Sequence, residues 1–170
     1  MTFWRLYYHL TWSTKDRAPL IIPDIEPRLF AYLVRKATEM GVYVYAVNGW
    51  NDHVHLIIAV PPKFALADVV KELKGASSHD LNHEVRLGYP FAWQRGYGAL
   101  SLGEKQRPVA EAYVRDQKIH HQQRTTHAWL ERYSELDEGP TDTGIQVPSV
   151  PSAVVREPDA VYDISGEPFF

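Results

Sequence analysis

The chain has 170 residues, of which 45% are hydrophobic and 23% charged, a composition typical of a folded globular protein that excludes wholesale disorder. No stretch approaches the roughly 18 apolar residues of a membrane-spanning helix, and the first residues lack the pattern of a secretory signal. The chain has no cysteine, which excludes disulfides and thiolate metal sites and is consistent with a cytoplasmic protein. The formal net charge of −3 argues at first against a nucleic-acid partner.

Hydrophobic periodicity and chain breakers predict alternating strands and helices. In chain order these are a strand over 3–14, a helix that ends at Gly41, strands over 42–50 and 53–60 that pair as a hairpin, a helix from about Ala67, one or two strands within 91–102, and a helix from Pro108 to about His127. The order β-α-β-β-α-β-α predicts an α+β fold of the ferredoxin-like, split β-α-β kind, with an antiparallel sheet, helices on one face and an additional C-terminal helix.

The charge is unevenly distributed along the chain. Residues 1–130 carry 16 Lys and Arg against 12 Asp and Glu, a net of +4, and residues 131–170 carry 2 against 9, a net of −7; the two sum to −3. The acidic part is also rich in proline and has no lasting helical or strand period. We therefore predict a folded domain over 1–132 and an acidic, Pro-rich extension over 133–170, so the objection to a nucleic-acid partner applies to the extension alone.

The pair His53 and His55 is the first candidate for chemistry. Side chains two positions apart in a strand project from the same face, so both imidazoles point together. Two imidazoles are poor core material unless each is hydrogen-bonded, but side by side they suit a divalent metal ion. Two ligands leave such an ion incomplete, so a third is expected elsewhere; the alternative is a pair of hydrogen-bonded structural or surface histidines.

The last predicted helix carries a polar stripe. Tyr113, Gln117, His120, His121 and Arg124 lie at positions i, i+4, i+7, i+8 and i+11 of one helix face. One interpretation is a tyrosine at the edge of the core beside a solvated face. The other makes Tyr113 a nucleophile and Gln117 a carbonyl-oxygen ligand, with His120 and His121 as auxiliary candidates; a metal on the scissile phosphate then offsets the weakness of a phenol as nucleophile.

Basic residues alternate with aromatic ones through the predicted domain. Cations that neutralise phosphates and rings that stack on bases are typical of proteins that bind single-stranded nucleic acid, although solvated helix faces and core aromatics have the same composition. The predicted DNA contacts are Arg5, Lys71, Lys74, Arg95, Arg115 and Lys118.

Four blocks of the sequence together resemble a known family, the HUH-type single-tyrosine transposases of bacterial and archaeal insertion sequences, also called the insertion-sequence 200-like family. The blocks cover residues 51–58, which contain His-Val-His, residues 61–78, residues 91–97, and residues 113–117, which read Tyr-x-x-x-Gln. They occur in the family's order across about residues 3–125, and the acidic extension lies outside the resemblance.

The resemblance implies a site and a reaction. His53, His55 and Gln117 would bind a divalent metal, Mg²⁺ or Mn²⁺, and Tyr113 would attack a phosphodiester of single-stranded DNA. The products would be a 5′-phosphotyrosine link and a free 3′-OH that can rejoin strands. The resemblance also implies recognition of DNA hairpins and a homodimer in which the tyrosine helix serves its own or the partner's site.

Two alternatives remain open at the level of sequence. One is a domesticated, repeat-associated tyrosine nuclease with the same chemistry, which the long extension leaves open. The other is a non-enzymatic nucleic-acid-binding module on the same layout, although a binder has no need for His-x-His together with Tyr-x-x-x-Gln.

Overall fold

Four short runs of β-forming residues make one antiparallel sheet in the computed structural model, which describes residues 2–85, 87–135 and 138–139. The strands are β1 (Tyr7–Ser13), β2 (Tyr43–Gly49), β3 (His53–Ala59) and β4 (Gly98–Leu102). Their order across the sheet is β2-β3-β1-β4, so the fully buried β3 lies between β1 and β2. This is the predicted split β-α-β arrangement, including the hairpin of β2 and β3.

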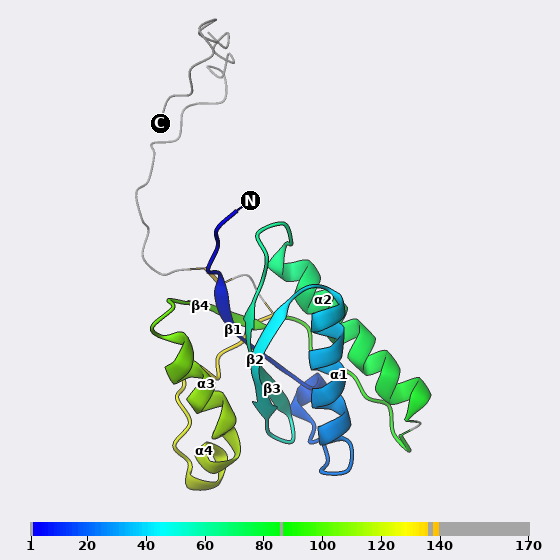
Figure 1. The fold of residues 1–170 in the computed structure, drawn as a ribbon. Coiled ribbons are helices and arrows are strands. Elements are labelled where there is room, and N and C mark those ends of the chain that lie inside the picture. The colour runs from blue at the N-terminus through cyan, green and yellow to red at the C-terminus, as the bar shows by residue number, and fades with distance from the viewer. Residues whose placement is uncertain (1, 86, 136–137, 140–170) are drawn as a thin grey trace, which may run out of the picture. The chain divides into compact units, whose positions relative to one another are not determined.

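The helices cover both faces of the sheet (Figure 1). On one face, α1 (Glu26–Glu39) and α2 (Leu66–His79), the latter continued by a π-helical turn over Asp80–Glu84, bury their apolar stripes in the main core. On the other face, α3 (Arg107–Arg115) and α4 (Gln117–Gln123) follow β4. A small second core of Ala46, Ile57 and Val114 attaches α3 to β2 and β3.

The structure differs from the sequence predictions in two details. The first strand begins at Tyr7 rather than residue 3, whereas within 91–102, where one or two strands are predicted, one strand, β4, follows Gly96 at a φ of +74°. The single helix predicted from Pro108 is two helices, because Asp116 leaves the helical region at φ −89° and ψ 12°. Tyr113 and Gln117 therefore lie on different helices, on either side of this break.

The chain after α4 returns to the sheet. Arg124 ends α4 in the left-handed conformation, and ten residues later Ser134 forms an isolated antiparallel bridge with Tyr97. The segment passes so close to β4 that a Cβ on Gly98 would overlap the carbonyl oxygen of Arg132. This close approach brings Glu131 over the sheet face that α3 and α4 also cover.

The chain divides into two units, Met1–Asp137 and Glu138–Phe170. Most of the acidic extension predicted for 133–170 lies outside the described residues. In the part of the chain that the structure describes, no helix is both long enough and apolar enough to span a membrane.

Candidate functional site

The strand β3 positions the two histidines of the His-x-His pair. His53 and His55 project from the face of β3 that α3 and α4 cover, while Val54 and Leu56 between and after them belong to the main core on the opposite face. Both rings are almost completely buried, with 2% and 0% of their surface exposed. The predicted juxtaposition of the two imidazoles is present.

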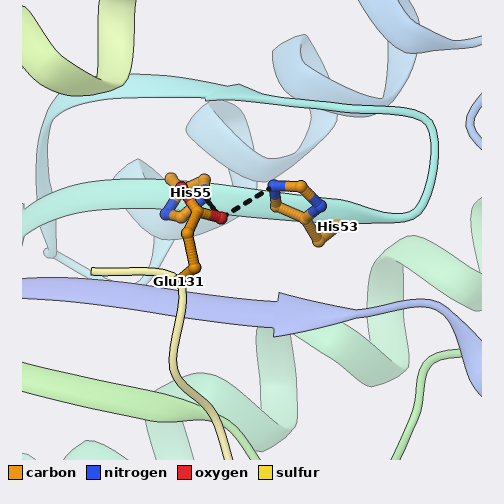
Figure 2. A group of neighbouring side chains, drawn as sticks. All are labelled: His53, His55 and Glu131. Atoms are coloured by element: carbon orange, nitrogen blue, oxygen red, sulfur yellow. Dashed lines mark hydrogen bonds and ion pairs between the residues drawn. The ribbon is translucent and has the colours of Figure 1, made fainter. Parts of the chain in front are cut away.

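A carboxylate that the sequence did not indicate lies between the two rings and the tyrosine. Glu131 Oε2 is 3.1 Å from His55 Nε2 and 3.3 Å from His53 Nε2, and Figure 2 shows the side chain pointing from the returning segment toward both rings. One ligand atom from each of these three residues lies within 4.8 Å of the others. The described residues thus contain a His-His-Glu group that can bind a metal ion.

Tyr113 and Gln117 meet at the other oxygen of the same carboxylate. Tyr113 Oη donates a hydrogen bond of 2.7 Å to Glu131 Oε1, and Gln117 Nε2 donates one of 2.8 Å to that atom. The backbone N–H of His127 donates to Tyr113 Oη at 3.0 Å, which fixes the phenol oxygen from a second side. The tyrosine, the glutamine and both histidines of one chain therefore converge on Glu131.

Three further contacts orient the histidines. His53 Nδ1 donates to Asp52 Oδ1 at 2.6 Å, and Asp52 in turn accepts a hydrogen bond of 2.9 Å from Arg17 Nε. His55 Nδ1 lies 2.9 Å from His9 Nε2, a buried pair. Each metal-candidate ring is thus held through its Nδ1 atom, which leaves both Nε2 atoms facing Glu131.

The auxiliary candidates both lie at the site. His121 Nε2 is 3.1 Å from His53 Nε2, and the His121 ring is parallel to that of Trp50 at a centroid distance of 5.1 Å. His120 packs against the Tyr113 ring at 4.5 Å. His120 therefore contacts the candidate nucleophile, and His121 contacts the metal-candidate side of the site.

Burial and hydrogen bonding set the charges at the centre of the site. Burial alone would raise the pKa of Glu131, but the hydrogen bonds it accepts from His53 and His55 hold that pKa well below its usual range. Burial raises the pKa of Tyr113 to about 12, and the negative charge of Glu131 acts in the same direction. The site at rest therefore pairs a carboxylate with a protonated phenol.

The two histidines of the pair have opposite shifts. Burial alone would lower the pKa of His53, but its hydrogen bonds to Asp52 and Glu131 raise it above its usual value. Burial lowers the pKa of His55, and it lowers the pKa of His9 to about 3. His9 and His55 are therefore neutral rings at physiological pH.

The donor set fits a divalent cation. Imidazole nitrogens suit transition-metal ions, whereas carboxylate and carbonyl oxygens suit Mg²⁺ and Mn²⁺, so each oxygen ligand beside the two histidines favours the latter two ions. Gln117 Oε1 is buried and has no hydrogen-bond partner in the described structure. A buried carbonyl oxygen without a partner is uncommon, and a bound cation is one partner that satisfies such an atom.

The six predicted DNA contacts do not form one cluster. Lys118 and Arg115 lie on α4 and α3 beside the site and pair with Glu26 and Glu111. Lys71 and Lys74 lie on α2, across the sheet from α3 and α4, and Lys74 Nζ donates to the backbone oxygens of Gln94 and Gly96 at 2.7 Å each. The remaining two, Arg5 and Arg95, are exposed outside helices and strands.

The sequence of this chain is similar to those of known proteins. The chain matches the family model described as "Transposase IS200 like" over residues 2–117. It is 29% identical over 119 residues to the ISDra2 transposase TnpA of Deinococcus radiodurans, covering 67% of this chain and 85% of that protein. It is 25% identical over 122 residues to the transposase for insertion sequence element IS200 of Salmonella typhimurium, covering 68% and 79%.

Two solved structures resemble it. A protein of Deinococcus radiodurans R1 assigned as a transposase superposes with a TM-score of 0.56 at 30% identity, covering 68% of this chain and 93% of that one. A REP-associated tyrosine transposase bound to a REP hairpin superposes with a TM-score of 0.54 over 76% of each chain, and its 14% identity shows likeness of fold alone. Glu131 lies beyond residue 117, where the family match ends.

Proposed function

Since the chain belongs to the IS200-like transposase family, we propose that this transposase cuts and rejoins hairpin-bearing single-stranded DNA ends, with Tyr113 as the nucleophile and a divalent metal at His53 and His55. One observation supports the proposal above the others. The Tyr113 hydroxyl and both imidazoles contact the two oxygens of a single carboxylate, Glu131. A phenol held this close to a metal-binding group is the arrangement that attack on a metal-bound phosphate requires.

The proposed metal ligands are His53, His55 and Gln117, the set that the sequence suggests, with Glu131 as a further ligand. The orphaned Oε1 of Gln117 and the position of Glu131 Oε2 between the two Nε2 atoms support this set. Oxygen donors from two side chains favour Mg²⁺ or Mn²⁺. When bound, the ion would polarise the scissile phosphate and stabilise the negative charge that develops on its oxygens.

The protein's own residues have separate tasks in the proposed reaction. Tyr113 Oη forms a bond to phosphorus, the bond from phosphorus to the 3′ oxygen breaks, and that oxygen takes a proton to become a free 3′-OH. Tyr113 must lose its own proton, which at rest it shares in a hydrogen bond with Glu131, and in the overall reaction this proton passes through solvent to the departing 3′ oxygen. The backbone N–H of His127 keeps the phenol oxygen in place through this change. The reverse reaction, with the 3′-OH of another strand, rejoins DNA without an external energy source.

The DNA partner is proposed from the family and from charge. Residues 1–130 have a net charge of +4, which favours a polyanion, and a fold relative is described as bound to a REP hairpin. Arg115 and Lys118, beside the site, are the proposed contacts nearest the scissile phosphate, with Arg5, Lys71, Lys74 and Arg95 further away. Family membership also supports a homodimer, and action on chromosomal DNA implies a cytoplasmic protein.

The proposal is tested with a hairpin-bearing single-stranded oligonucleotide, the full chain and Mn²⁺. We expect a covalent protein–DNA adduct that is absent from Tyr113→Phe, because that variant lacks only the attacking oxygen. An adduct that persists in Tyr113→Phe would assign the nucleophile to another tyrosine, with Tyr133 or Tyr97 next to be tested. DNA binding without any adduct would instead support the non-enzymatic binding module.

A further inference from the structure

We propose that His9 is a positioning residue of the metal site, which holds His55 with its Nε2 atom presented to the ion. The inference rests on the proposed function only in so far as His55 is taken as a metal ligand. His9 comes from β1, the strand beside β3, and it is not part of the His-x-His or Tyr-x-x-x-Gln blocks.

The contact between the two rings has the geometry of an in-plane hydrogen bond. His9 Nε2 lies 2.9 Å from His55 Nδ1, the ring planes differ by 11°, and the centroids are 5.1 Å apart. Centroids this far apart with nitrogens this close mean that the rings meet edge to edge. His9 is 2% exposed and His55 is 0% exposed, so bulk water does not compete for these two atoms.

His9 contacts Nδ1 of His55, the ring nitrogen that does not bind the ion when Nε2 is the metal ligand. An imidazole that binds a metal through Nε2 carries its proton on Nδ1, and the partner of that N–H sets the tautomer and the orientation of the ring. For His53 this partner is Asp52, a common arrangement in metal sites. His55 has no carboxylate at its Nδ1 in the described structure, and His9 takes that place.

A neutral histidine can serve both states of a neutral His55, whereas a carboxylate only accepts and would require a protonated ring when Nε2 also carries a proton, as for His53. Without an ion, His55 Nε2 faces Glu131 at 3.1 Å and carries the proton, so Nδ1 must accept a hydrogen bond from His9. With an ion on Nε2, His55 Nδ1 must donate, and His9 Nε2 accepts. His9 serves both states by changing tautomer: its proton is on Nε2 without the ion and on Nδ1 with the ion.

Two measurements test the proposal. In Mg²⁺-loaded protein labelled with nitrogen-15, NMR should show the His55 proton on Nδ1 and a scalar coupling across the hydrogen bond to His9 Nε2. By calorimetry, His9→Leu should bind Mn²⁺ about 10- to 100-fold more weakly than wild type, the usual effect of removing such a partner. His9→Gln should retain most of the affinity, because an amide both donates and accepts.

The controls separate positioning from simple packing. His79→Leu changes an exposed histidine on α2 and should leave Mn²⁺ affinity unchanged. If His9→Leu does not fold, the NMR measurement on wild type still decides, since a His55 proton on Nε2 in the Mg²⁺-loaded protein would overturn the proposal. A folded His9→Leu with wild-type affinity would also overturn it. Neither result would affect a Tyr113-dependent DNA adduct, so the proposed function would stand on its own test.

Discussion

Replacing Glu131 with Gln removes one negative charge from the site and nearly preserves the shape of the side chain. The carboxylate lies between both imidazoles, and the ligand atoms of the three residues lie within 4.8 Å of one another, so a shared cation would be closer than that to the charge. At about 4 Å and an effective dielectric constant near 20, each pair of unit charges interacts by about 4 kcal/mol.

Not all of this energy is lost in the variant. A glutamine can still offer a neutral amide oxygen to the ion, although its amide cannot accept on both atoms as the carboxylate does, on Oε1 from Tyr113 and Gln117 and on Oε2 from His55. We therefore expect Glu131→Gln to weaken Mn²⁺ binding by at least tenfold, which corresponds to about 1.4 kcal/mol. Isothermal titration of the full chain with MnCl₂ measures the change.

Two comparisons make the result specific. Glu135→Gln removes the same charge from the same segment, but Glu135 contacts Gln94 rather than the site, so its affinity should match wild type. Gln117→Leu tests the ligand that the sequence suggests. Wild-type affinity in Glu131→Gln together with a large loss in Gln117→Leu would refute the role of Glu131 and leave Gln117 as the third ligand.

Two further predictions concern the supports of the site. Gly98→Ala should weaken Mn²⁺ binding in titration, because its Cβ would push the Arg132 carbonyl, and with it Glu131, away from the histidines. Gly75→Ala has open space around its Cβ and should bind Mn²⁺ like the wild type. Equal Mn²⁺ affinities in the two variants would contradict this prediction. Mn²⁺ binding requires a neutral His53, whose pKa is raised, so the Mn²⁺ affinity should fall as the pH decreases through that pKa. Because Asp52 contributes to the raised pKa, Asp52→Asn should move this loss of affinity to lower pH in titrations between about pH 5 and 8. A midpoint that stays or rises would contradict the assigned cause.

Local periodicity was sufficient for the parts of the site that lie on regular elements. Alternation along β3 places His53 and His55 on one face, and a spacing of four residues brings Tyr113 and Gln117 to the same carboxylate. The order of strands and helices likewise follows from apolar spacing and breakers, because the core of a split β-α-β sheet requires those patterns. The break at Asp116 interrupts no apolar period, so nothing in the sequence indicated it.

Long-range neighbours were not predictable in the same way. Glu131 is 76 positions from His55 and lies in an irregular segment, where no period shows which way a side chain points. His9 fits the alternation of β1, but its contact with His55 depends on the pairing of β1 with β3, which one sequence does not determine. The hydrogen-bond partners of both residues at the site are distant in sequence, so only the tertiary packing of the chain brings them together.

The bridge between Tyr97 and Ser134 determines where this chain can be shortened. A truncation after residue 132, the predicted end of the folded domain, would keep Glu131 but remove the bridge that follows it. Such a protein could lose metal affinity for a reason unrelated to the acidic extension. A shortened chain intended to measure what the extension does should therefore keep residues 1–135, so that the bridge at Ser134 still attaches the segment of Glu131 to the sheet.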